Sequence, residues 1–227
     1  MAKLAGIVDT VAGWRFFKPL VFLACLTPGA LLGWSAYKVF AQGDQLALTV
    51  DPIKGLEHAT GQYSLWILCI TLSITPVRRV LGANRLQRVR RMLGVWAFTY
   101  AVAHLSVYLV FDQSCYSLAS CDYVAIWQDI VKRPFIFMGM TAFMIMLALA
   151  ITSTSGWVRR LKKNWQRLHR LVYVAAVAAI IHFIWIQKSD FSRPTRFAIW
   201  VGILFGIRII LAIRKRRARL PVRAVTA

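Results

Sequence analysis

Six apolar runs recur along this chain of 227 residues. A helix needs about 20 apolar residues to cross the roughly 30 Å of hydrocarbon in a bilayer, and runs of this order predict spanning helices. The second and fifth runs are somewhat short, and we expect their polar flanks to extend them. The runs cover Pro19–Phe40, Thr60–Thr75, Leu93–Phe111, Phe135–Thr152, Leu171–Ile186 and Phe197–Ile213.

The expected fold is therefore all-α, an integral membrane bundle of six transmembrane helices. Hydrophobic residues make up 59% of the chain, more than a soluble domain of this length needs. The connecting segments are too short for a separate soluble domain. We therefore expect residues 1–227 to form a single transmembrane domain.

The formal net charge of +21 is distributed unevenly between the loops. Arginine and lysine cluster after the second span, after the fourth span and in the C-terminal tail. This alternation follows the positive-inside rule and predicts that both termini and the Arg-rich loops are cytoplasmic. Nucleic acid is an unsuitable partner, because no stacking platform or groove-reading motif accompanies the charge. The loops of the other side carry Asp44, Asp51, Glu57, Asp112, Asp122 and Asp129.

The four histidines all lie in or at the edge of a span. Polar groups inside a membrane are costly and usually functional. One such histidine is often only a packing or hydrogen-bonding residue, but a set of four indicates a site. They are His58, His104, His169 and His182.

Two of the histidines lie at the same expected depth. The third span starts near Arg91, which places His104 about 20 Å up its helix at 1.5 Å per residue. The fifth span starts near Arg170, which places His182 about 18 Å up. Equal depth on two parallel helices suits axial ligation of one planar macrocycle, a haem, in the outer half of the membrane. A proton relay is the alternative, but it would more usually include intramembrane Asp or Glu, and the acids here lie outside the spans or at their edges.

His169 is expected about 20 Å below His182, near the cytoplasmic face. Thirteen residues are about 3.6 turns, so an ideal helix would not present both rings on one face, and a kink or offset cofactors would be needed. Arg90 is a candidate contact at this inner level, because it precedes His104 by nearly four turns. Its guanidinium suits a propionate or a phosphate, and the alternative is a charge that only sets the topology.

Two features of the outer side stay open in the sequence. His58, at the outer end of the second span, either caps the outer cofactor or a quinone pocket, or is an interfacial histidine that orients the helix start. Cys115 and Cys121 share the third loop, where an oxidising compartment would permit a disulfide.

Four segments carry a family resemblance: "DPIKGLEHATG…ITPVRR", "RRMLGVWAFTYAVAHLSVY", "KRPFIFMGM" and "ITSTSGWVRRLKKNWQRLHRLVYVAA…IHFIW". They resemble the MsrQ (YedZ) family, the haem-binding membrane subunits of the periplasmic methionine sulfoxide reductase system. The resemblance covers about Asp51 to Trp185. More distantly, a core of about residues 51–187 is similar to the ferric reductase-like transmembrane domain of NADPH oxidases and metalloreductases.

The resemblance implies haem b, with the family's haem histidines falling on His104, His169 and His182. It further implies FMN or a quinone as a possible second cofactor, a cytoplasmic flavin reductase or the quinol pool as donor, and the bacterial inner membrane as location. The acceptor it implies is a periplasmic methionine sulfoxide reductase subunit containing molybdopterin. The chain departs from the oxidase pattern of two histidines on each of two helices, because the third span has only His104. The number of haems therefore stays open.

The leading functional prediction is a transmembrane electron-transfer subunit, distinct from the catalytic subunit. An alternative of the same class is a metalloreductase that reduces extracytoplasmic ferric or cupric ions. A small proton or solute transporter is the alternative from another class, and the lack of intramembrane carboxylates argues against it. A membrane scaffold is weaker still, because it has no need of four histidines associated with spans.

Overall fold

The computed structural model describes residues 2–44, 47–117, 119–187 and 190–217. Six of its helices are long and apolar enough to cross a membrane, which confirms the expected bundle. The second and fifth spans are extended by their flanks, as expected. The spans are α2 (Phe17–Gln42), α3 (Pro52–Leu81), α4 (Gln87–Val107, after the short turn η2, Asn84–Leu86), α6 (Pro134–Ile151), α8 with α9 (Lys163–His169, Val172–Ile186) and α10 (Ser192–Arg217).

Three shorter helices flank the spans, and the sequence did not predict them. These are α1 (Ala2–Gly13), α5 (Tyr123–Lys132) and α7 (Ser155–Leu161). The side chain of Asp122 accepts hydrogen bonds from the backbone N–H of Val124 and Ala125, and so caps the start of α5. Asp51 caps α3 in the same way, and its hydrogen bonds from Lys54 hold the pKa of the Asp51 carboxyl below its ordinary value.

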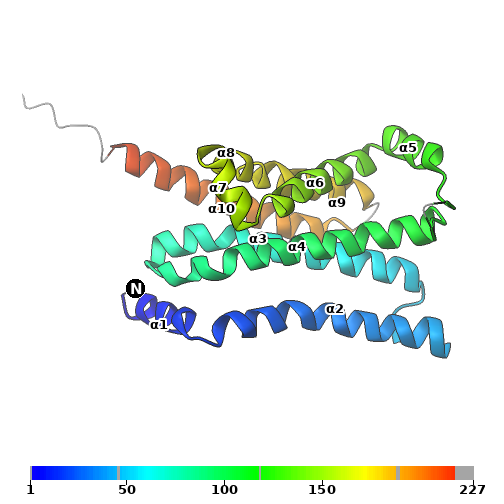
Figure 1. Ribbon diagram of the computed structural model, residues 1–227, viewed down its shortest axis with the longest axis horizontal. Coiled ribbons are helices and arrows are strands. Elements are labelled where there is room, and N and C mark those ends of the chain that lie inside the picture. Colours follow the sequence, from blue (N-terminus) through cyan, green and yellow to red (C-terminus); the bar gives the residue numbers. More distant parts are fainter. Residues whose placement is uncertain (1, 45–46, 118, 188–189, 218–227) are drawn as a thin grey trace, which may run out of the picture.

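Two helix pairs form the centre of the bundle (Figure 1). α3 lies along α4, α6 lies along α9, and α10 packs against both α3 and α9. Small and aliphatic residues fill the interior between them, and Cys69 is among the most deeply buried. Fully buried side chains in this core are Cys69, Leu72, Ala97, Ala175 and Ala176.

The first span is attached to this core by a tyrosine hydroxyl. α2 has one buried residue, Cys25. The hydroxyl of Tyr100 donates to the carbonyl oxygen of Cys25 (2.6 Å) and accepts from the N–H of Gly29 (2.8 Å). In a regular helix these two backbone groups pair with each other. The hydroxyl therefore bridges one step of the α2 hydrogen-bond ladder, directly beside Pro28.

A proline also interrupts the backbone hydrogen bonds of α3, and an arginine side chain replaces the missing donor. Pro76 is buried inside α3 and has no N–H, so the carbonyl of Leu72, four residues earlier, loses its helical partner. Nη2 of Arg208, on α10, donates to this oxygen at 2.5 Å. Arg208 lies within the sixth predicted span, and the sequence analysis did not single it out.

The two described ends of the chain lie at the same end of the bundle, as an even number of spans requires (Figure 1). α7 and α8 lie toward that end, and α5 lies at the opposite one. The loop before α5 contains a disulfide between Cys115 and Cys121, a pairing that the sequence leaves open.

Candidate functional site

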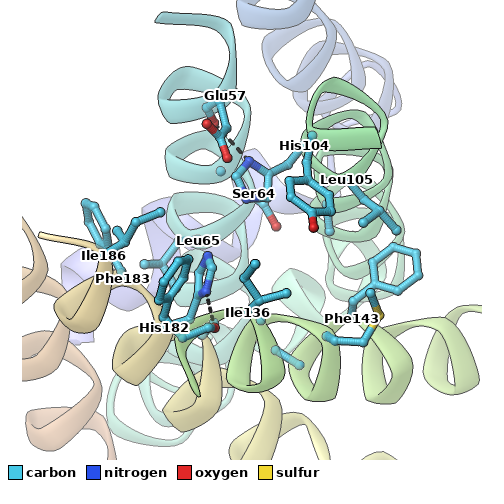
Figure 2. Close-up of a pocket in the computed structure, with 18 of the residues that line it drawn as sticks. Glu57, Ser64, Leu65, His104, Leu105, Ile136, Phe143, His182, Phe183 and Ile186 are labelled. Carbon is cyan, nitrogen blue, oxygen red and sulfur yellow. Dashed lines mark hydrogen bonds between the residues drawn. The ribbon is translucent and has the colours of Figure 1, made fainter. Parts of the chain in front are cut away.

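The structure brings His104 of α4 and His182 of α9 together. Their ring centroids are 6.1 Å apart and their ring planes are inclined by 76°. Figure 2 shows both rings beside one cavity between the helices. The two imidazoles, for which residue counting predicts equal depth, therefore lie next to each other.

Each of these imidazoles is oriented by a backbone carbonyl of another helix. Nδ1 of His104 lies 2.9 Å from the carbonyl oxygen of Glu57, and Nδ1 of His182 lies 2.6 Å from that of Phe135. A carbonyl only accepts, so each Nδ1 carries the hydrogen and donates it. Each Nε2 then keeps its lone pair, which is the state in which histidine binds a metal.

Each imidazole also rests against a helical glycine. A Cβ added to Gly61 would lie 3.2 Å from Nδ1 and Cε1 of His104, and one added to Gly139 would lie 2.8 Å from Nδ1 of His182. Small residues let membrane helices and their side chains approach closely. Both histidines therefore occupy space that a larger residue at the glycine would fill.

The cavity has a volume of about 320 Å³, which is within the range of small-molecule sites. Its walls come from α3, α4, α6 and α9, and most of the lining is apolar. Two methionines of α6 take part, Met140 and Met146; methionine adapts its shape to irregular partners such as a flat cofactor. Apolar lining residues include Leu65, Leu68, Leu105, Phe143, Phe183 and Ile186.

Polar side chains gather at the mouth of this cavity that lies toward α5. Nε of Arg133 pairs with Oδ1 of Asp129 at 3.3 Å. The hydroxyl of Tyr108 donates to Oδ2 of Asp129 at 3.1 Å, and Gln113 donates to both groups. The π-helical turn Tyr108–Asp112 ends the third span here, and such turns are frequent at functional sites. Among the described residues that line the cavity, Arg133 is the one lysine or arginine.

Of the other two histidines, His58 lies close enough to His104 for their charges to interact, whereas His169 does not line the cavity. His58 is exposed and lines the outer edge of the cavity. His169 ends α8 and stacks on Trp165, with ring centroids 3.9 Å apart. Its Nδ1 lies 3.2 Å from the Trp165 carbonyl oxygen, and its Nε2 is buried without a hydrogen-bond partner among the described residues. Arg90 lies close enough to His169 for their charges to interact.

The helix carrying His169 and His182 is interrupted between them. α8 ends at His169 and α9 begins at Val172. The sequence required a kink or offset cofactors if both rings were to serve one path, and the structure has a break at this point.

A bis-histidine haem fits the separation of His104 and His182. His104 and His182 would hold the group through their Nε2 lone pairs, one from each of two helices. The observed centroid separation is 6.1 Å. Two protein ligands suit a macrocycle that supplies four donors of its own.

Comparison with known proteins places the chain in a family. Residues 59–180 match the family described as ferric reductase like transmembrane component. The chain is 44% identical over 200 residues to the protein-methionine-sulfoxide reductase heme-binding subunit MsrQ of Xanthomonas euvesicatoria, which covers 88% of each chain. The MsrQ protein of Herminiimonas arsenicoxydans is 43% identical over 202 residues, 88% of this chain and 87% of its own length. No solved structure gives a significant match.

The fold and the match define the class of ferric reductase-like transmembrane proteins. Within that class, the chain belongs to the MsrQ family. It is a multi-pass protein of the bacterial inner membrane.

Several site residues were missing from the sequence analysis. The two glycines and the two carbonyl groups act across helix interfaces, which spacing within one helix does not reveal. Arg133 stands in the quoted motif "KRPFIFMGM" together with Phe135 and Gly139, directly before the proline that starts α6. Arg133 could have been found, because it is a charged residue that adjoins a spanning helix near the depth of the histidines.

Proposed function

We propose that this chain is a transmembrane electron-transfer subunit that holds haem b between His104 and His182. The observation that carries the proposal is the convergence of two imidazoles with free Nε2 atoms on one apolar cavity. Membership of a ferric reductase-like family supports an electron-transfer role. The names of the relatives support haem as the cofactor.

When bound, haem supplies reversible one-electron chemistry at iron, tuned by its axial ligands and its burial. The chain's own residues hold and orient the ligands. The carbonyls of Glu57 and Phe135 fix the tautomer and the rotation of each imidazole. The apolar walls exclude water, and Arg133 at the polar mouth would pair with a carboxylate of the cofactor.

We place electron entry at the inner level, at His169 and Arg90. The support is their proximity and the buried, unpartnered Nε2 of His169. A cytoplasmic flavin reductase, with FMN or another flavin, or a quinol would deliver electrons there. His58, on the outer edge of the cavity, would shield the haem or contact a quinone from the other side.

Electrons would leave at the outer face to a periplasmic methionine sulfoxide reductase subunit that carries molybdopterin. The relatives' printed names support a methionine sulfoxide reductase as partner. Two acidic residues of this side are exposed, Asp112, which also lines the cavity, and Asp122, and they would offer a docking face for such a subunit.

Optical spectra of the purified protein test the haem assignment. His104→Ala and His182→Ala should each abolish the low-spin spectrum of the outer haem, whereas His58→Ala should keep it. Size-exclusion profiles would show that each variant is folded. A folded protein that retains the low-spin spectrum in both alanine variants would show that the ligand pair is wrong.

A further inference from the structure

Three arginines and a tyrosine gather at the inner level of the bundle, each from a different helix. Arg208 of α10 lies with its guanidinium carbon 4.7 Å from the ring centroid of Tyr173 on α9 and donates to the tyrosine hydroxyl. Arg90 of α4 is close enough to interact with Tyr173 and with Arg78 of α3, and Arg208 interacts with Arg90. We call Arg78, Arg90, Arg208 and Tyr173 the inner arginine cluster.

Arg208 is too deep to be only a topology-setting charge. It reaches the carbonyl of Leu72, which precedes the last residue of α3, Leu81, by nine positions. Nine residues of helix are about 13 Å, so this arginine reaches well inside the span. A charged side chain at such depth is expensive and usually marks a functional site.

The cluster has no acidic counterpart in the part of the chain that the structure describes. The ion pairs found there are Arg85 with Asp9, Lys54 with Asp51, and Arg133 with Asp129, and none involves the cluster. The Nε atoms of Arg78 and Arg208 are buried without a hydrogen-bond partner. The three arginines are partly buried, and positive charges held together away from water without an opposite charge are unfavourable, so an anion from outside the chain would stabilise this arrangement.

We propose that the inner arginine cluster binds the phosphate group of an anionic ligand. Three guanidiniums offer more donors than the two oxygens of one carboxylate can pair, whereas a phosphate offers three oxygens and up to two negative charges. Arginine pairs with such oxygens in a bidentate manner. The phosphate would come either from a flavin mononucleotide or from the headgroup of an anionic phospholipid in the inner leaflet. The proposal rests on the proposed function only for the role of this level in electron entry.

A purely structural role explains part of the cluster. Pro76 frees the Leu72 carbonyl, and Arg208 satisfies it. That contact uses one nitrogen of one arginine. It gives no reason for two further guanidiniums on α3 and α4, where repulsion between like charges opposes packing.

The test measures binding by the full chain in uncharged detergent after removal of copurified lipid. One arm compares flavin mononucleotide with riboflavin, which has the same ring system and no phosphate. The other compares the thermal stability gained from phosphatidylglycerol with that gained from zwitterionic phosphatidylcholine. The variants are Arg90→Gln and Arg208→Gln. Arg91→Gln and Arg214→Gln are the matched controls, since both residues are exposed and lie on the same two helices as Arg90 and Arg208.

We expect the wild type and both controls to prefer the anionic ligand of one arm, by at least about tenfold in affinity for the flavin pair. In the cluster variants, the ratio between the effect of the anionic ligand and that of its comparison ligand should fall close to one. Preference in the flavin arm identifies a nucleotide phosphate, and preference in the lipid arm identifies a headgroup. Absence of both preferences in the wild type, or their persistence in both cluster variants, overturns the proposal.

Two further measurements keep the outcome clear. Arg208→Lys retains the charge but loses the planar fork, and should keep only part of the preference. The haem spectrum of each sample reports on His104 and His182 alone. Loss of the proposed haem assignment would therefore appear in that spectrum without altering the phosphate comparison.

Discussion

His182 is held by two residues one helical turn apart on α6: the carbonyl of Phe135 accepts its Nδ1–H, and Gly139 lies against its ring. The same relation recurs at His104, where the carbonyl belongs to Glu57 and the glycine is Gly61. In each case the glycine stands four residues after the carbonyl, so both lie on one helix face. Because the glycine has no Cβ, the imidazole can come close enough to hydrogen-bond the carbonyl oxygen. This oxygen also accepts a hydrogen bond within its own helix.

This arrangement makes the glycine a requirement for the ligand's position. In Gly139→Ala, the new Cβ would lie 2.8 Å from Nδ1 of His182, so the ring must move. Overpacking of this kind costs about 1–3 kcal/mol. We expect the variant to lose thermal stability and to show a weakened or high-spin haem spectrum.

Gly94→Ala is the control on α4, where the nearest atom to the new Cβ is 3.9 Å away. Removing a glycine from a helix interior should leave stability unchanged or raise it by roughly 0.5–1 kcal/mol. Identical spectra and melting temperatures in the two variants would contradict the role assigned to Gly139.

Arg133 provides a second test at this scale. A cation at the mouth of the cavity stabilises the reduced form of a nearby haem relative to the more positive oxidised form. Because the side chain is 56% exposed and paired with Asp129, the effect is screened. We expect Arg133→Gln to lower the midpoint potential by roughly 20–60 mV. A redox titration of the haem band measures it.

Lys132→Gln is its matched control. Lys132 is adjacent and loses the same charge, but it is exposed and bonds to Gln128 outside the cavity. A shift of equal size in the two variants would indicate a general surface effect.

The sequence identified the histidines but not their supports, for a physical reason. Depth along one helix follows from residue count, so His104 and His182 were matched correctly before the structure was known. Which glycine among 13 faces a histidine depends on how separate helices pack. Arg208 could have been found, because an arginine inside the run "GILFGIRIILAI" is rare in a span.

At the scale of elements, α2 stands at the side of the bundle, and the bridge made by Tyr100 is one of its contacts with α4 (Figure 1). Tyr100→Phe removes the hydroxyl between Cys25 and Gly29. Two backbone groups beside Pro28 are then left to pair again or stay unsatisfied, at a cost of about 1–3 kcal/mol. We expect lower thermal stability with an unchanged haem spectrum.

Tyr63→Phe serves as the comparison for this variant. The Tyr63 ring packs edge-on against Tyr100, but its hydroxyl takes no part in the bridge. If both variants lose stability equally, ring packing rather than the bridge attaches α2.

Hydropathy predicted the six spans because each is long and apolar enough to stand out from its flanks. It did not predict α5, which has 10 residues, or α7, which has seven. Such short helices depend on caps, as at Asp122, and on packing at the edges of the bundle. The break after His169 was anticipated only as a geometric need, since no proline or glycine marks it.

Across the whole molecule, the proposed function predicts a direction. The Arg-rich loops define the inner face, where an anionic flavin-bearing donor would be attracted. In sealed vesicles, an impermeant flavin reductase supplied with NADH should reduce the haem only from that face. Comparison of inside-out with right-side-out vesicles measures this. Equal reduction from both sides would refute the direction and leave the ligand assignment intact.

The contact between Leu72 and Arg208 also bears on how the protein is made. Synthesis delivers α3 to the membrane long before α10. During that interval the carbonyl freed by Pro76 faces a medium that offers few donors. It gains its permanent partner only when the last span arrives. α10 thus completes the hydrogen bonding of α3, and a nascent chain released before Arg208 would keep an unpaired carbonyl inside its second span.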